Sequence, residues 1–214
     1  MITVSEWWAQ ANEQAHALTG WEAMAVLLAI AYLLLAMRRS LWCWPAAAGS
    51  TVIYMALFWH VALLMESVLN FYYLLMAGYG FWQWRFGGDR GAGLALTRWS
   101  WTTHLVIIAG TTAVALGLGY LMDTRTHADL AYLDALTTCF AVVTTVMVAR
   151  KVVENWLYWV VIDLVSIYLY LEKGLYLTSG LFLFYVGMAA LAYLQWRDQH
   201  RKEQSDPNWG LGCA

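Results

Sequence analysis

ENWLYWVVIDLVSIYLYLEKGLYL, residues 154–177, is a run of apolar and aromatic residues interrupted by a few amide and ionisable groups. About 20 apolar residues at 1.5 Å rise are needed to cross a hydrocarbon core about 30 Å thick, so the stretch predicts a membrane-spanning helix. An aspartate at the centre of such a helix, here Asp163, costs roughly 2.5–3.5 kcal/mol on insertion scales. We therefore expect its carboxylate to face a bundle interior, a cavity or a charged partner.

The whole chain has the composition of an integral membrane protein. Of its 214 residues, 62 % are hydrophobic and only 12 % are charged. The continuously apolar runs are unlike the alternating segments of about 10 residues that build an outer-membrane barrel. We predict an all-α membrane protein with seven transmembrane helices, near 21–37, 41–59, 62–84, 101–121, 130–149, 153–171 and 175–196.

Lys and Arg residues predict the orientation, because basic residues near helix ends stay on the cytoplasmic side. Ten of the twelve basic residues fall in alternate connections or in the C-terminal tail, and only Arg125 and Lys173 fall on the other side. We expect a multi-pass membrane protein with the N-terminus outside and the C-terminus in the cytoplasm. The first twenty residues lack Lys and Arg and do not resemble a cleaved signal.

A constant offset of 112 residues, which we call the repeat offset, superposes two parts of the sequence without gaps. In this register Trp44 matches Trp156, and the block Gln83-Trp84-Arg85 matches Gln195-Trp196-Arg197. Three helices, one spare helix and three helices then form a 3+1+3 arrangement of parallel repeats, with a substrate site expected between the halves. The expected parts are a periplasmic segment 1–20, a first repeat 21–86, a linker and fourth helix 87–128, a second repeat 129–197 and a cytoplasmic tail 198–214.

Polar and aromatic residues share one face of the helix predicted at 153–171. At 100° per residue, Asn155, Trp159, Asp163 and Tyr170 fall within an arc of roughly 80°. A cavity that combines ring faces with a carboxylate suits a flat, cationic, heteroaromatic solute, because each cation–π contact contributes roughly 0.5–2 kcal/mol. The alternative is that Asp163 pairs with Lys173 or an Arg and only holds helices together.

Three stretches resemble the PnuC family of bacterial vitamin transporters, namely RKVVENWLYWVVID (150–163), EKGLYLTSGL (172–181) and LNFYYLLMAGYGFWQW (69–84). The resemblance spans nearly the whole chain and implies a fold related to the SWEET sugar facilitators and a location in the bacterial inner (plasma) membrane. It also implies facilitated diffusion of nicotinamide riboside. A cytoplasmic kinase, which need not contact the transporter, then traps the product by phosphorylation. By this resemblance, Asn155, Trp156, Trp159, Asp163 and Asn70 fall on the family's site.

The candidate substrate-binding residues are Asn155, Trp156, Trp159, Asp163, Asn70, Tyr73, Glu66, Lys173, Tyr176 and Tyr185. Asp163 and Asn70 stand where riboside-type members would carry an amide and a glutamine. The substrate is therefore nicotinamide riboside or, as the alternative, thiamine, which other relatives carry and which is also a heteroaromatic cation. For Glu66 and Lys173, a position at the membrane interface is the other reading.

Other classes of protein lack support in the sequence. A retinal protein would need its Schiff-base lysine in the middle of a helix, whereas Lys173 precedes Gly174 near a helix end. Neither an HExxH nor a GxSxG motif is present, so we expect no enzyme, no metal and no cofactor. No basic patch with interleaved aromatics indicates a nucleic-acid partner. Small residues such as Gly78 and Gly187 suit close packing of helices or protomers, and we expect a homo-oligomer.

Overall fold

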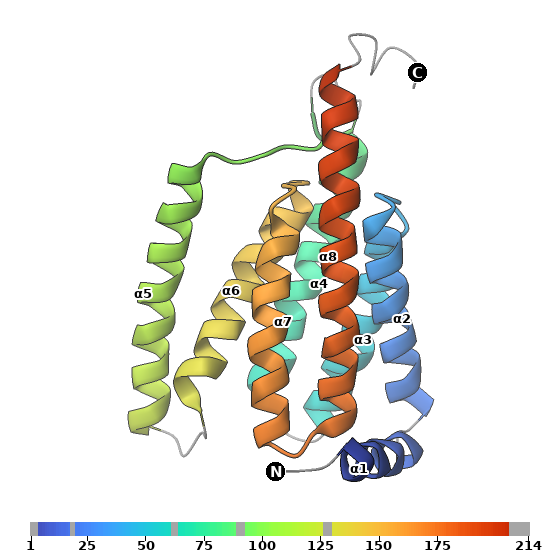
Figure 1. Ribbon diagram of the computed structural model, residues 1–214, viewed down its shortest axis with the longest axis vertical. Helices are drawn as coiled ribbons and strands as arrows, with labels where there is room; N and C mark the ends of the chain where they lie inside the picture. The colour runs from blue at the N-terminus through green and yellow to red at the C-terminus, as the bar shows by residue number, and fades with distance from the viewer. Residues whose placement is uncertain (1–3, 18–19, 61–63, 89–92, 126–129, 206–214) are drawn as a thin grey trace.

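The computed structural model describes residues 4–17, 20–60, 64–88, 93–125 and 130–205, and these residues form eight helices (Figure 1). In chain order the helices are α1 (Val4–Ala17), α2 (Gly20–Met37), α3 (Cys43–His60), α4 (Leu64–Phe86), α5 (Trp101–Arg125), α6 (Ala131–Ala149), α7 (Asn155–Glu172) and α8 (Tyr176–Ser205). An isolated β-bridge joins Thr97 to Val152. The prediction of an all-helical chain is confirmed.

Each of the seven predicted apolar runs corresponds to one helix from α2 to α8. Four of these helices, α2, α5, α6 and α8, are long and apolar enough to cross a membrane. In α3 the apolar run is shorter, at Cys43–Leu57. The helix α8 continues beyond the predicted 175–196 to Ser205, so that it stands above the rest of the bundle in Figure 1.

The helix α1 is absent from the sequence-based expectation, which treats residues 1–20 only as a polar segment. It lies across the end of the bundle that carries the N-terminus (Figure 1). Trp7 packs against α8, where a Cβ on Gly180 would lie 3.0 Å from the indole ring. Trp8 is 69 % exposed, as is common for tryptophan at a membrane interface. An amphipathic helix across the bundle end was missed because its apolar residues are too few for a membrane span.

The turns that follow α2 and α6 have the same geometry and are related by the repeat offset. Arg39 has a φ of 55° and Lys151, its counterpart, has a φ of 50°. Ser40 donates its backbone N–H to the Leu35 carbonyl over 2.9 Å. At the equivalent positions, Val152 donates its N–H to the Met147 carbonyl over 3.0 Å. The same offset relates the first residues of α3 and α4 to the first residues of α7 and α8. The register found in the sequence therefore recurs in the backbone of the described residues.

The helix α5 stands beside α6 at the edge of the bundle, while the other long helices pack around one another (Figure 1). The segment before α5 is fixed to the turn between α6 and α7. Thr97 donates its N–H to Lys151 and accepts one from Val153, over 3.0 and 2.9 Å, and Lys151 Nζ donates to the Leu94 carbonyl over 2.7 Å. These bonds place the beginning of α5 next to the beginning of α7.

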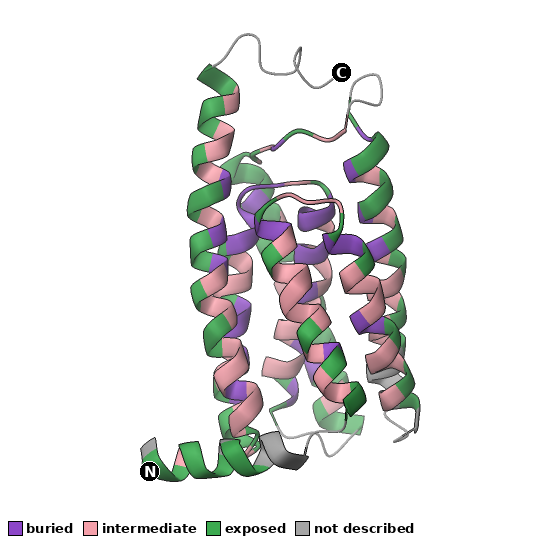
Figure 2. Cartoon of the chain, turned by 90° about the vertical axis from the view of Figure 1, so that its right-hand side faces the viewer, coloured by how far each residue is buried: buried purple, intermediate pink, exposed green. Residues whose placement is uncertain are grey.

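Buried residues gather in the half of the bundle away from α1, where α2, α4 and α6 end (Figure 2). The turns and helix ends there also hold most of the described basic residues, among them Arg39, Arg85, Arg150, Lys151 and Arg197. Arg39 forms an ion pair with Glu203 of the α8 extension. The predicted charge asymmetry thus corresponds to one end of the folded bundle.

Candidate functional site

The helix α7 presents its predicted polar face to the interior. Asn155 is 0 % exposed and Asp163 is 4 % exposed, whereas Val161 on the opposite side is 61 % exposed. Trp159 is half-buried and packs against the hydrophobic core. This burial confirms that the Asp163 carboxylate points inward, as the 100° spacing predicts.

Asp163 makes no hydrogen bond and no ion pair with any residue that the structure describes. The Tyr185 phenol of α8 is close enough to interact electrostatically with Asp163 and with Tyr54 of α3. Lys173 is exposed at the C-cap of α7, ten residues and about 15 Å along the helix from Asp163. The described residues therefore show no ion pair between Lys173 and Asp163.

Aromatic side chains from three helices lie near one another on the face of α7 that carries Asp163. The Tyr170 and Phe182 ring centroids lie 4.9 Å apart, and those of Phe182 and Tyr185 lie 5.5 Å apart. Tyr73 of α4 is half-buried and lies near Tyr170. We call Tyr73, Tyr170, Phe182 and Tyr185 the central aromatic cluster. The cluster joins α4, α7 and α8, and its member Tyr185 lies near the buried Asp163 carboxylate.

Four tryptophans form a second arrangement, which we call the Trp tetrad: Trp44, Trp84, Trp156 and Trp196. Trp44 and Trp84 meet edge to face, with centroids 5.3 Å apart and planes at 86°. Trp156 and Trp196 repeat this geometry at 5.4 Å and 90°. Trp84 and Trp196 then meet each other at 6.1 Å. All four side chains are at most 5 % exposed.

Hydrogen bonds cross between the two halves of the Trp tetrad. Trp84 of α4 donates its indole N–H to the Val148 carbonyl near the end of α6, over 3.2 Å. Trp196 of α8 donates its indole N–H to the Met37 carbonyl at the end of α2, over 3.0 Å. Trp84 thus ties α4 to the end of α6, and Trp196 ties α8 to the end of α2. The indole nitrogens of Trp44 and Trp156 are buried without a partner among the described residues.

The predicted site residues separate into groups along the bundle. Asn155 and Trp156 lie near the turn between α6 and α7, where Asn155 Nδ2 donates to the Val152 carbonyl over 2.6 Å and its Oδ1 has no partner among the described residues. Tyr73 and Tyr185 belong to the central aromatic cluster, in which Tyr185 lies near Asp163 and Tyr73 lies near Tyr170.

The remaining predicted residues lie elsewhere or are not described. Asn70 is half-buried one helical turn before Tyr73 on α4. Tyr176 begins α8 and is half-buried, close to the exposed Lys173 and far from Asn155 along the bundle. The side chain of Glu66 lies outside the described residues. The structure therefore brings some of the candidates together but does not place all of them in one site.

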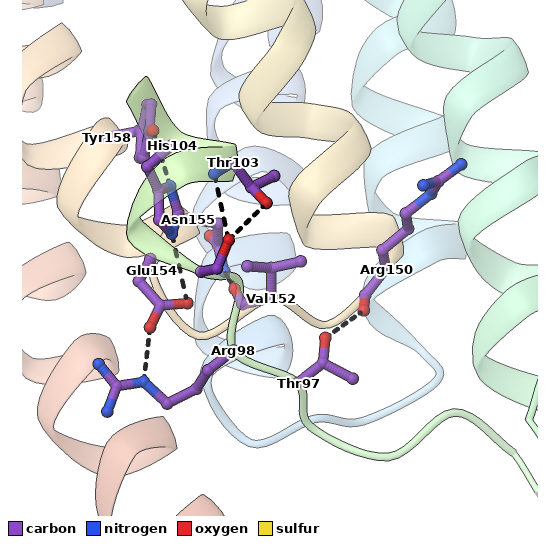
Figure 3. Close-up of polar contacts among 10 residues, drawn as sticks. Thr97, Arg98, Thr103, His104, Arg150, Val152, Glu154, Asn155 and Tyr158 are labelled. Atoms are coloured by element: carbon purple, nitrogen blue, oxygen red, sulfur yellow. Dashed lines mark hydrogen bonds and ion pairs between the residues drawn. The ribbon is translucent and has the colours of Figure 1, made fainter. Parts of the chain in front are cut away.

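A polar cluster at the start of α5 and α7 was missed by sequence reasoning. Arg98 Nε donates to Glu154 Oε1 over 2.6 Å, and His104 Nδ1 lies 2.9 Å from the Tyr158 hydroxyl (Figure 3). The Glu154 carboxylate raises the pKa of Arg98. No local signal reveals this cluster, because the partners in each pair come from different helices or connections that are distant in the chain. The Trp tetrad, by contrast, had a signal in the repeat offset.

A family model described as nicotinamide mononucleotide transporter matches residues 19–198. The chain belongs to this family. It is 27 % identical over 188 residues to the riboflavin/roseoflavin transporter RibM of Streptomyces davaonensis, covering 83 % of this chain and 84 % of that one. It is 22 % identical over 174 residues to the nicotinamide riboside transporter PnuC of Escherichia coli, covering 70 % and 73 %.

The fold is also similar to a crystal structure of the vitamin B3 transporter PnuC, with a TM-score of 0.69 and 17 % identity over 94 % of both chains. The resemblance to the PnuC family is thereby confirmed. Because the family and these relatives are transporters, the chain is a multi-pass membrane transporter of the vitamin type and not an enzyme.

Proposed function

We propose that this chain carries nicotinamide riboside, a quaternary pyridinium cation, across the membrane by facilitated diffusion. The observation that supports this most directly is Asp163, a carboxylate that is 4 % exposed and has no hydrogen-bond or ion-pair partner among the described residues. A buried charge is costly unless it is paired, so the site is most stable when a cation is present. Aromatic rings around the same carboxylate would stack on the pyridinium ring.

Riboflavin is the second candidate, because RibM has higher identity to this chain than PnuC does. Its isoalloxazine ring is neutral and larger, so it gains nothing from an anionic Asp163. Thiamine remains the alternative from the sequence, since its thiazolium is also a quaternary cation. A buried carboxylate favours either cation over the flavin, and the resemblance to PnuC places the riboside ahead of thiamine.

We infer a 3+1+3 architecture in which α2–α4 and α6–α8 are parallel repeats and α5 is the connecting helix. The equal spacing of the turns and the reciprocal hydrogen bonds of Trp84 and Trp196 support this. The substrate would then lie between the repeats at the central aromatic cluster, with the N-terminus outside. Phosphorylation of the product by a cytoplasmic kinase would make net uptake directional, and no ion coupling is needed.

The Trp tetrad would act as the closed gate at the basic end of the bundle. Its two halves are held by one ring contact and two hydrogen bonds, while the buried N–H groups of Trp44 and Trp156 lack partners among the described residues. A buried donor without a partner costs about 1–3 kcal/mol, so the closed state contains a cost that opening to water relieves. Separation of the two halves would connect the central site to this end.

Calorimetric titration of the detergent-purified protein tests the proposal. We expect riboside binding in the native chain and at least about tenfold weaker binding in Asp163→Asn, because a hydrogen bond or contact to a charged group contributes about 1.5–3 kcal/mol. Asp123→Asn, which changes an exposed carboxylate at the far end of α5, is the matched control and should bind normally. Riboflavin binding that is insensitive to Asp163→Asn, without riboside binding, would replace the proposal by the flavin candidate.

A further inference from the structure

A cavity of about 610 Å³ lies between α5, α6 and α7, on the side of α7 that faces away from Asp163. Its volume is within the range of about 300–1,000 Å³ that small-molecule sites occupy. Neither Trp159 nor Asp163 lines it. The cavity is therefore separate from the proposed substrate site.

The cavity has one polar end, at Glu154. This residue is 8 % exposed, and only Oε1 of its carboxylate is bonded, by Arg98 Nε. Oε2 is buried without a hydrogen bond from the described residues, and His104 Nε2 lies 3.9 Å from it (Figure 3). A buried anionic oxygen of this kind is costly unless a donor reaches it. The polar end thus requires a hydrogen-bond donor, and a cationic one would suit it best.

Arg98 supplies the opposite charge at the mouth of the cavity. Its side chain is 52 % exposed, and its terminal NH₂ groups form no hydrogen bond with the described residues. A guanidinium with free N–H groups is well suited to a phosphate. Trp101 lines the same end and is 80 % exposed, as expected for a tryptophan at the level of lipid headgroups.

The rest of the cavity is apolar and open to the side. Ile108, Leu136, Phe140 and Val165 line it, and Val161, also in the lining, is 61 % exposed. From Glu154 to Val165 the cavity follows about 16 Å of helix, which is half of a hydrocarbon core about 30 Å thick. A lateral apolar opening of this length has room for part of an acyl chain from one leaflet.

We propose that this cavity is a binding site for a phospholipid whose headgroup carries a primary amine, such as phosphatidylethanolamine. Its ammonium donates to Glu154 Oε2, its phosphate binds the terminal N–H groups of Arg98, and an acyl chain lies along α7. Phosphatidylcholine lacks the N–H donors that Oε2 requires. Phosphatidylglycerol offers Oε2 only neutral hydroxyl donors, whose hydrogen bonds to a carboxylate are weaker than those of an ammonium.

Native mass spectrometry of the full-length, detergent-purified protein tests this. The probe is an equimolar mixture of phosphatidylethanolamine, phosphatidylcholine and phosphatidylglycerol with identical acyl chains. We expect the ethanolamine lipid to be retained preferentially, and retention to fall about tenfold in Glu154→Gln, as for a hydrogen bond to a charged group. Val161→Trp, which fills the lateral opening, should have the same effect without any change of charge.

Val114→Trp, at a position on α5 that is 59 % exposed and does not line the cavity, is the matched control and should retain the lipid. Equal retention of the three lipids, undiminished retention in Val161→Trp, or no retained lipid would each overturn the proposal. Displacement of the lipid by nicotinamide riboside would also overturn it, because the cavity would then be part of the substrate path.

Discussion

Trp84 and Trp196 lie 6.1 Å apart between ring centroids, and each donates its indole N–H to the end of a helix from the opposite half of the bundle. The two residues are related by the repeat offset, as are their edge-to-face partners Trp44 and Trp156. The contact therefore joins two positions that the repeat offset relates, one on α4 and one on α8. Its energetic role can be tested by substitutions that keep the ring and remove the donor.

Trp196→Phe removes the hydrogen bond to the Met37 carbonyl and keeps an aromatic ring. We expect it to lower the free energy of unfolding by about 1–3 kcal/mol, because the buried Met37 carbonyl is left without its donor. Trp84→Phe should do the same through Val148, and the double variant should be non-additive because the rings touch. Trp82→Phe is the control, since Trp82 lies on α4, the helix that carries Trp84, and is 54 % exposed.

Unfolding in detergent measures these differences, and uptake into liposomes shows whether a weakened gate changes transport. Additive effects of the Trp84 and Trp196 substitutions would mean that the two halves of the Trp tetrad are energetically independent. In that case the proposed gate would lose its support.

Gly80→Ala tests the packing of Trp44 against α4. A Cβ at Gly80 would lie 2.2 Å from the Trp44 ring, so the indole must move and the tetrad must repack. Overpacking of this kind costs about 1–3 kcal/mol. Gly78→Ala, two residues earlier, meets nothing within 4 Å and should be neutral or slightly stabilising through helix propensity. Equal thermal midpoints of the two variants would contradict the packing of Trp44 described above.

Tyr73 is predicted to contact the substrate through its ring and not through its hydroxyl. Tyr73→Phe should therefore bind nicotinamide riboside about as well as the native chain. Tyr73→Ala should bind it several-fold more weakly, as expected for one lost cation–π contact of about 0.5–2 kcal/mol. Titration calorimetry separates these cases, and a large loss in the Phe variant would show that the hydroxyl is the contact.

Lys151 gives the protein a specific pH dependence. Burial, assisted by the nearby Arg39 guanidinium, lowers the pKa of Lys151 to about 8, whereas a free lysine titrates near 10.5. Between these values the unfolded chain binds the proton and the folded chain does not, so the free energy of unfolding rises with pH from about 8 to about 10.5. Below pH 8 Lys151 is charged in both the folded and the unfolded chain, and the folded chain then bears the full cost of burying the ammonium.

A comparison of thermal midpoints between pH 7.5 and 9.5 checks this sign. The native chain should gain stability relative to Lys151→Gln as the pH rises, whereas Lys202→Gln, at an exposed position of α8, should follow the native chain throughout. Parallel curves for the native chain and Lys151→Gln would mean that this ammonium is not buried in solution.

Much of the fold could be predicted because membrane helices are encoded locally. The length and apolarity of the runs predicted α2–α8, and the 100° spacing predicted that Asp163 points inward. The helix α1 was missed because an interfacial helix lacks a long apolar run. Lys173 stays a prediction as a site residue, and the structure places it at the C-cap of α7, about 15 Å along the helix from Asp163.

The sequence by itself determined the helices α2–α8 and the family, because hydropathy and short motifs depend on residues close together in the chain. Only the tertiary structure decided which side chains meet. Trp196 reaches a carbonyl 159 residues away, and Arg98 reaches a carboxylate 56 residues away. Such contacts depend on how the helices pack side by side, and no pattern within one helix contains that information.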